Sequence, residues 1–332
     1  MIPASPPLGL FNQMWGATAL SDRAVLETAI GEMALVESLG FASVWIGEHH
    51  LSPSSGAFHG RVPAAEVFLA HLAARLPRIT VGTGVKLFAT DARRAAEEMM
   101  MLQLLAPDRV EFGIGQGPTL PGSPESREEK SRRFRRQLSE LLFFLTGEMS
   151  LSLAAQPNLA QRLWIAARDD ESIALAAERG LNFVVGQAEI GIAQARFVRR
   201  YRAAGGQGEA RGVRLVFLAE THAEAVAQCA EATELYFAAL GNKGYHAQAV
   251  AEGLLPETAD TPEERRRQVD FLVGRPDEVA ERLNAHIDLL GLDRLDLMPQ
   301  LPGLPTDAVQ RSLRLIATEL QPRLRFPGRQ AA

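Results

Sequence analysis

Apolar and polar positions follow a regular order along the chain, in which short apolar runs are separated by longer segments with helical periodicity. A short apolar or alternating run indicates a strand, whereas apolar residues at every third or fourth position indicate a helix. Strands and helices that follow one another in this way are typical of a parallel sheet. The eight predicted strands cover residues 8–12, 43–47, 78–88, 109–115, 162–166, 181–186, 213–220 and 294–300.

Residues that start and stop helices separate these segments. Ser21 is suited to cap the first helix and Gly40 to end it. Pro276 is suited to the first position of a late helix, and Gly291 to its end. The predicted helices cover residues 21–39, 62–75, 92–105, 126–146, 169–179, 189–204, 222–239 and 276–290.

Eight strands with helices between them predict an α/β fold of the TIM type, a (β/α)8 barrel, with residues 1–332 as a single domain. A doubly wound open sheet gives nearly the same local signals and stays an alternative. Residues 241–275 interrupt the regular order, so we expect an insertion there, near the seventh and eighth units, and a mobile lid is its expected role. In a barrel the chemistry lies where strands end at the C-terminal face.

Composition argues against several classes of function. The net charge is −5 and the pI about 5.9, so no global positive field attracts nucleic acid. Cys229 is the only cysteine, which excludes an intramolecular disulfide and a cysteine-based metal site. No basic start with an apolar run and no stretch of roughly 20 apolar residues is present. We therefore expect a soluble, cytoplasmic protein that binds neither nucleic acid nor a membrane.

Three titratable side chains, Glu48, His49 and His50, directly follow the strand at 43–47. Metal ligation with His59 is one interpretation, but adjacent residues at a strand end point apart, and the HxH and HExxH spacings are missing. A structural histidine bonded to a backbone carbonyl is a second. General acid or base catalysis is the interpretation we favour, because an imidazole titrates near neutral pH. We expect no metal.

Small and polar residues follow three further strands. Gly84 lies inside a predicted strand, where a glycine marks either a bulge or the close approach of a ligand. The glycines at 113–117 lack the full pattern of a dinucleotide-binding loop and lead into prolines rather than into a helix. Asp169 and Asp170 begin the next helix, where capping is the simpler role and an anion site the alternative.

Several segments together resemble the bacterial luciferase-like family of flavin-dependent monooxygenases. They occur in the family's order over nearly the whole chain and read ESLGFASVWIGEHH, ITVGTGVKL, RRAAEEMMMLQLLAPDRVEFGIGQG, LWIAARDDESIALAAERGL, GRPDEVAERL and IATELQPRLR. The resemblance implies a (β/α)8 barrel, usually a homodimer, with reduced FMN as cosubstrate. Reduced FMN and oxygen then form a C4a-hydroperoxyflavin, which oxidises an aldehyde or another small organic substrate.

The resemblance also implies roles for individual residues. His49 is the candidate acid or base beside the reactive edge of the flavin, and His50 and Glu48 shape the same pocket. The family's cis peptide bond falls on Gly84 and Val85. The residues that the resemblance places around the cofactor are Thr83, Gly84, Val85, Gly115, Gln116, Gly117, Arg168 and Ser172.

Two positions depart from the family's phosphate-binding pattern. Gln116 stands where the family commonly has arginine, and Asp169 where it commonly has serine, whereas Ser172 keeps a later hydroxyl. A phosphate carries about −1.5 to −2 charges, so it would meet a carboxylate and lose a cation. Arg168 is the candidate to compensate. We therefore expect weak or transient FMN binding, with reduced FMN delivered by a separate flavin reductase.

Two other functions stay open. A deazaflavin-dependent oxidoreductase would share the barrel and transfer a hydride without oxygen. A non-catalytic flavin-binding paralogue would account for Gln116 and Asp169, but not for the intact His49. The sequence does not identify the substrate, and the residues that either line an apolar cavity or simply pack in the core are Phe11, Met14, Trp15, Phe58 and Phe88.

Overall fold

The computed structural model describes residues 7–50, 58–87, 91–117, 125–240 and 244–327. Within these residues, eight parallel strands close into a barrel, because β11 pairs with β1 and β8 with β9. The predicted TIM barrel is confirmed, and the open-sheet alternative is wrong. In order around the barrel the strands are β1 (Leu8–Asn12), β3 (Ser43–Ile46), β5 (Thr80–Leu87), β6 (Val110–Gly115), β7 (Leu163–Ala166), β8 (Asn182–Val185), β9 (Ala210–Leu218) and β11 (Arg294–Met298).

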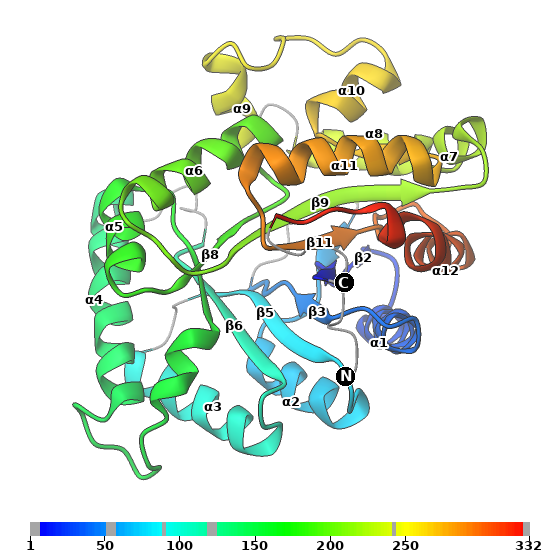
Figure 1. Ribbon diagram of the computed structural model, residues 1–332. Coiled ribbons are helices and arrows are strands. Elements are labelled where there is room, and N and C mark those ends of the chain that lie inside the picture. Colours follow the sequence, from blue (N-terminus) through cyan, green and yellow to red (C-terminus); the bar gives the residue numbers. More distant parts are fainter. Residues whose placement is uncertain (1–6, 51–57, 88–90, 118–124, 241–243, 328–332) are drawn as a thin grey trace.

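Helices surround the strands on the outside of the barrel (Figure 1). They are α1 (Asp22–Ser38), α2 (Ala65–Arg75), α3 (Ala92–Leu105), α4 (Arg127–Thr146), α5 (Asp170–Glu178), α6 (Gly191–Ala203), α7 (His222–Gln228), α8 (Ala230–Leu240), α9 (Gly244–Ala251), α10 (Pro262–Gln268), α11 (Pro276–Leu290) and α12 (Thr306–Leu315). Short turns of other helix types, η1 (Pro157–Arg162), η2 (Ile316–Leu320) and η3 (Gln321–Arg323), complete the chain.

Local signals placed the helix ends well. The Ser21 side chain accepts a hydrogen bond from the Ala24 N–H at the start of α1, as predicted. Pro276 is the first residue of α11, and Gly291 ends that helix with a φ of 62°. The helix predicted over 222–239 is instead two helices, α7 and α8, which meet at Cys229.

Three short strands were not predicted. Strands β2 (Trp15–Ala17) and β4 (Phe58–Gly60) form an antiparallel hairpin beside the barrel. Strand β10 (Leu272–Gly274) pairs with the far end of β9. Each of these strands has three residues, too few for apolar periodicity to be recognised.

The predicted insertion contains α9, α10 and β10, while residues 241–243 lie outside the described residues. Figure 1 shows α9 and α10 at one edge of the molecule, beyond α8 and α11. Helix α10 packs against α8, and it begins with a capping box between Thr261 and Glu264. The insertion is therefore folded onto the barrel by its own helices. Its role as a mobile lid stays a prediction.

The lower interior of the barrel holds a buried arginine. The Arg211 guanidinium lies between two indole rings, 4.0 Å from the Trp45 centroid and 4.3 Å from that of Trp164. It donates to both carboxylate oxygens of Asp296 and to Glu111 Oε2 at distances of 2.9 to 3.1 Å. A buried charge with such partners is tolerated. The Arg211 side chain and its partners fill the interior of the barrel at this level.

Candidate active site

The C-terminal ends of the strands open into a cavity of about 940 Å³. That volume suits a cofactor and a substrate together, since small-molecule sites occupy roughly 300–1,000 Å³. Its lining comes from the barrel strands, from α4, from the loops after β7 and β8, and from the insertion. Of the predicted site residues, those in the lining are Glu48, His49, His50, Thr83, Gly84, Val85, Gly115, Gln116, Gly117 and Arg168.

His49 occupies a narrow slot between the end of β3 and the β2–β4 hairpin. A Cβ atom on Gly60 would overlap His49 Cδ2, so the ring leaves room only for glycine there, and a Cβ atom on Gly47 would displace Gln13 Oε1. His49 Nε2 lies 2.8 Å from Gln13 Oε1. With the Gln13 amide oxygen assigned as the atom that faces the ring, Nε2 carries the hydrogen and donates the hydrogen bond. Nδ1 is then the nitrogen that can accept a proton.

Burial lowers the pKa of His49 below its ordinary value of 6.5. A hydrogen bond to the Gln13 backbone acts in the opposite direction, and the nearby imidazoles of His50 and His59 lower this pKa further. The His49 ring is therefore neutral near neutral pH. A half-buried neutral imidazole in a cavity wall is suited to act as a base.

Glu48 and His50 line the same cavity but contact each other. Glu48 Oε1 accepts a hydrogen bond from the Leu87 N–H at 3.0 Å and lies 2.9 Å from His50 Nε2. The carboxylate is buried, whereas 40 % of the His50 side chain is exposed. Glu48 thus ties the end of β5 to the loop after β3, and His50 lies at the rim.

The Gly84–Val85 peptide bond is cis, in agreement with the bond that the resemblance implies. A Cβ atom on Gly84 would overlap the Phe11 ring, and one on Gly115 would lie 2.7 Å from Val85 Cγ2, which explains the glycines. Thr83 Oγ1 donates to the Gly113 carbonyl at 2.9 Å and so joins β5 to β6.

Asp169 caps α5, as the simpler interpretation predicted. Its Oδ1 accepts from the Ser172 N–H at 2.9 Å and from Arg135 Nη1 at 3.0 Å. Burial alone would raise the pKa of Asp169, but the hydrogen bonds from Ser172 and the charge of Arg135 hold it below its ordinary value. Ser172 is fully buried, and its side chain is not part of the cavity wall. Arg135 of α4 therefore neutralises the carboxylate that departs from the family pattern.

Arg168 lies in the cavity wall, but a carboxylate already pairs with it. Arg168 Nε donates to Glu189 Oε1 at 2.6 Å, and Nη1 donates to the Ala167 carbonyl at 2.7 Å. Its guanidinium also lies 5.0 Å from the centre of the Phe197 ring. The expected compensation by Arg168 thus competes with Glu189, a partner that the sequence analysis did not identify.

Sequence reasoning also missed three cations in the wall. Arg127, Lys130 and Arg133 of α4 all line the cavity. Burial lowers the pKa of Lys130 and the charge of Arg133 lowers it further, while Glu125 pairs with Arg133 at 2.8 Å. A spacing of three residues after the Ser126 cap places them on one helix face, and this spacing is the signal that could have found them. We call these three residues the α4 side of the cavity.

Aromatic residues support the wall that holds His49. The Trp15 ring centre lies 6.5 Å from that of His49, 5.8 Å from that of Tyr236 and 5.2 Å from that of Phe58. Tyr236 of α8 lines the cavity, and Trp15 packs behind it. Of the apolar candidates, Phe11 lines the cavity, Met14 is buried in the main core, and Phe88 lies outside the described residues. We call His49, Gln13 and Tyr236 the His49 side.

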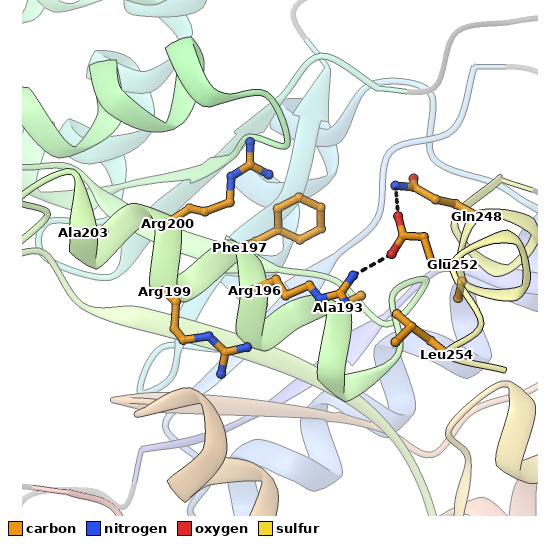
Figure 2. A pocket seen from close by; sticks show the side chains of 10 residues that line it. Ala193, Arg196, Phe197, Arg199, Arg200, Ala203, Gln248, Glu252 and Leu254 are labelled. Carbon is orange, nitrogen blue, oxygen red and sulfur yellow. Dashed lines mark hydrogen bonds and ion pairs between the residues drawn. The ribbon is translucent and has the colours of Figure 1, made fainter.

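A smaller cavity of about 480 Å³ lies between α6 and α9 (Figure 2). Glu252 accepts hydrogen bonds there from Arg196 Nη1 at 2.6 Å and from Gln248 Nε2 at 2.8 Å. Gln248 belongs to the lining of both cavities, so α9 separates them. The Arg196–Glu252 pair holds α9 against α6.

In the described part of the chain, no group of three histidine, cysteine, aspartate or glutamate side chains is placed to hold a metal ion. Nor does any described helix combine the length and the apolar character that crossing a membrane requires.

Comparison with known proteins gives a consistent result. A family model described as luciferase-like monooxygenase matches residues 9–294. The protein YwcH of Bacillus subtilis (strain 168) is 27 % identical over 314 residues, which cover 84 % of this chain and 89 % of YwcH.

Two solved structures share the fold. The oxygenating constituent of 3,6-diketocamphane monooxygenase from Pseudomonas putida, a type II Baeyer–Villiger monooxygenase in complex with FMN, has a TM-score of 0.76 at 21 % identity, with 98 % of this chain and 100 % of that chain covered. An F420-dependent secondary alcohol dehydrogenase in complex with an F420–acetone adduct has a TM-score of 0.68 at 13 % identity, with coverages of 97 % and 99 %.

Proposed function

We propose that this chain, which belongs to the luciferase-like monooxygenase family, uses reduced FMN and molecular oxygen to oxidise a small organic substrate. The bound flavin would supply a C4a-hydroperoxyflavin that gives one oxygen atom to the substrate, while the other leaves as water and the flavin is oxidised. The observation that carries the proposal is one cavity that joins the neutral His49 and a cationic α4 side.

The donor set of the α4 side fits a flavin phosphate. Arg127, Lys130 and Arg133 present guanidinium and ammonium donors, which are the side chains that bind phosphate most strongly. Because burial and Arg133 lower the pKa of Lys130, a bound anion there would relieve an electrostatic cost. Asp169 offers little repulsion, since Arg135 lies 3.0 Å away.

His49 is the residue proposed to move a proton. His49 Nε2–H donates to Gln13. Nδ1 is therefore the ring atom proposed to accept a proton from the substrate and to return it. The slot between Gly47 and Gly60 fixes the ring plane. Burial of the ring keeps water away from the reacting atoms.

Weak FMN binding and a lid complete the proposal. Gln116 supplies no charge, and its Oε1 accepts a hydrogen bond from Ser131 at 3.1 Å, so one cation of the family's pattern is missing. A separate flavin reductase would then deliver reduced FMN, and a homodimer is the proposed assembly. Helix α9, anchored by the Arg196–Glu252 pair, would close the cavity during the reaction.

An anaerobic titration with oxidised and reduced FMN, followed by admission of oxygen, tests the proposal. We expect reduced FMN to bind reversibly, and an oxygenated flavin absorbance band to persist longer in the wild type than in His49→Ala. Both proteins should bind FMN alike, because His49 is not on the α4 side.

Other outcomes would change the assignment. Binding of F420 in place of both FMN forms would identify a deazaflavin-dependent oxidoreductase. FMN binding without any reaction of the reduced form with oxygen and substrate would identify a non-catalytic paralogue. Purification with stoichiometric, slowly exchanging FMN would contradict weak binding.

A further inference from the structure

We propose that the Tyr236 hydroxyl donates a hydrogen bond to an uncharged acceptor oxygen of the organic substrate. The inference rests on the proposed function, because it places the substrate beside His49. It adds a substrate-binding residue that comes from α8, outside the strand ends where sequence reasoning searched.

The first observation is a buried phenol without a partner. Tyr236 is 1 % exposed and lines the large cavity, and its hydroxyl has no hydrogen-bond partner among the described residues. Tyr201, also fully buried, donates to the Leu181 carbonyl at 2.6 Å and accepts from the Gly208 N–H at 2.9 Å. Buried tyrosine hydroxyls usually have such partners, so Tyr236 lacks one that a ligand can supply.

The two charged groups that influence the pKa of Tyr236, Arg214 and Glu189, do not supply that partner. Arg214 pairs with Asp270 and donates to the Glu189 carbonyl at 2.6 Å. The Glu189 carboxylate accepts from Arg168 at 2.6 Å and from the Gly186 N–H at 2.9 Å. Because these groups satisfy one another, no acceptor among the described residues serves the phenol, and a substrate oxygen in the cavity is suited to that place. Burial also raises the pKa of Tyr236, so the hydroxyl stays protonated and donates.

Arg211 is the other cavity-lining residue with a buried polar atom that lacks a partner among the described residues, its Nε. Its remaining nitrogens bind Asp296 and Glu111, and two indole rings enclose it. Arg211 is thus fixed by the protein at the base of the barrel. Tyr236 has a single polar side-chain atom, and that atom is unbound.

The position of Tyr236 links it to His49. The Trp15 ring packs against both rings, with centre distances of 5.8 Å and 6.5 Å, so one indole supports both polar side chains of this wall. The apolar residues that share a hydrophobic cluster with Tyr236 and line the cavity include Phe11, Val213 and Val269. An apolar surface with one neutral donor selects an uncharged molecule with an acceptor oxygen.

The test uses pairs of probes that differ in the acceptor alone. Cyclohexanone and methylenecyclohexane, and acetophenone and α-methylstyrene, have the same shape, but the second member of each pair has no acceptor oxygen. Calorimetric titrations of wild type and Tyr236→Phe would be run with and without FMN. We expect the ratio of ketone affinity to alkene affinity to fall roughly tenfold in Tyr236→Phe, the effect of one lost hydrogen bond. An unchanged ratio, or a wild type that binds no ketone, would overturn the proposal.

Thermal unfolding provides the matched control. Tyr236→Phe should melt at the wild-type temperature or higher, because no protein hydrogen bond is lost, whereas Tyr201→Phe should melt lower. If both variants melt lower to the same extent, the Tyr236 hydroxyl is structural and the proposal fails. FMN affinity, which depends on the α4 side, should not change in Tyr236→Phe. A failure of the proposed flavin chemistry would therefore appear in the FMN titration and not in these ratios.

Discussion

The two sides of the cavity differ in the charge of their side chains. The α4 side presents Arg127, Lys130 and Arg133, with Arg127 exposed to solvent. On the His49 side the polar groups are a neutral imidazole, an amide and a phenol. A charge near solvent costs little, whereas the same charge deep in the barrel costs several kcal/mol without a partner. The comparison therefore supports the proposal that the charged tail of a flavin binds on the α4 side and the reacting atoms lie on the His49 side.

Disturbing the slot that holds His49 should have the largest effect. In Gly60→Ala the added Cβ overlaps the His49 ring, so the ring must turn and lose its hydrogen bond to Gln13. We expect the rate of substrate oxidation to fall by about 100-fold, the typical contribution of a positioned acid or base.

FMN affinity, measured by fluorescence quenching, should stay unchanged in Gly60→Ala. Gly31→Ala is the matched control, because a Cβ there meets no atom within 4 Å. A variant that retains the full rate would show that the position of the His49 ring does not matter.

Removing a charge from the α4 side should affect binding and not chemistry. We expect Lys130→Gln to weaken FMN binding by roughly tenfold, the loss of one charge-assisted hydrogen bond. Riboflavin, which has no phosphate, should bind wild type and variant equally.

Arg132→Gln is the control for Lys130→Gln, since Arg132 lies on the same helix but does not line the cavity. If Lys130→Gln lowered the affinities for FMN and riboflavin equally, the α4 side would not be the site of the FMN phosphate.

The pH dependence should report the neutral state of His49. Because the folded pKa of His49 is lower than 6.5, the ring stays neutral as the pH falls to that value and gains a proton only below it. The acid decline in rate should therefore have its midpoint below 6.5, the ordinary pKa of an imidazole. His49 contributes stability that is present above pH 6.5 and is lost as the pH falls through its lower folded pKa.

His50→Gln removes a charge that disfavours protonation of His49, so the acid decline should move to higher pH by a small amount. Rate profiles of the two proteins between pH 5 and 8 would measure the shift. An acid decline that His49→Gln leaves in place would assign the titration to another group.

The smallest expected effect concerns α9, which borders the cavity. Glu252→Gln weakens the ion pair with Arg196, whose side chains are 37 % and 48 % exposed. Exposed pairs contribute about 0–1 kcal/mol, so FMN should dissociate only about two- to fivefold faster.

Stopped-flow measurement of FMN release would detect such a change. Glu257→Gln, in the same insertion but without a recorded ion pair among the described residues, is the control. Identical release rates for all three proteins would argue against α9 as a lid.

The sequence by itself determined the alternation of strands and helices, most helix ends and the place of His49. Each of these depends on signals within a few residues: apolar periodicity, the cap at Ser21, the stop at Gly291 and the position of His49 just after a strand. Since parallel strands of a barrel all end at one face, the order of the elements was enough to bring the predicted residues other than Ser172 to one cavity.

Only the tertiary structure decided which side chains meet there. Arg135, 34 residues away in the sequence, neutralises Asp169, and Glu189, 21 residues away, forms an ion pair with Arg168. Tyr236 reaches the cavity from α8, behind which Trp15 packs. Such pairs depend on strand register and on how helices pack against the barrel, and neither leaves a periodic trace in the sequence. The charge on the cavity wall was therefore fixed by packing between distant segments.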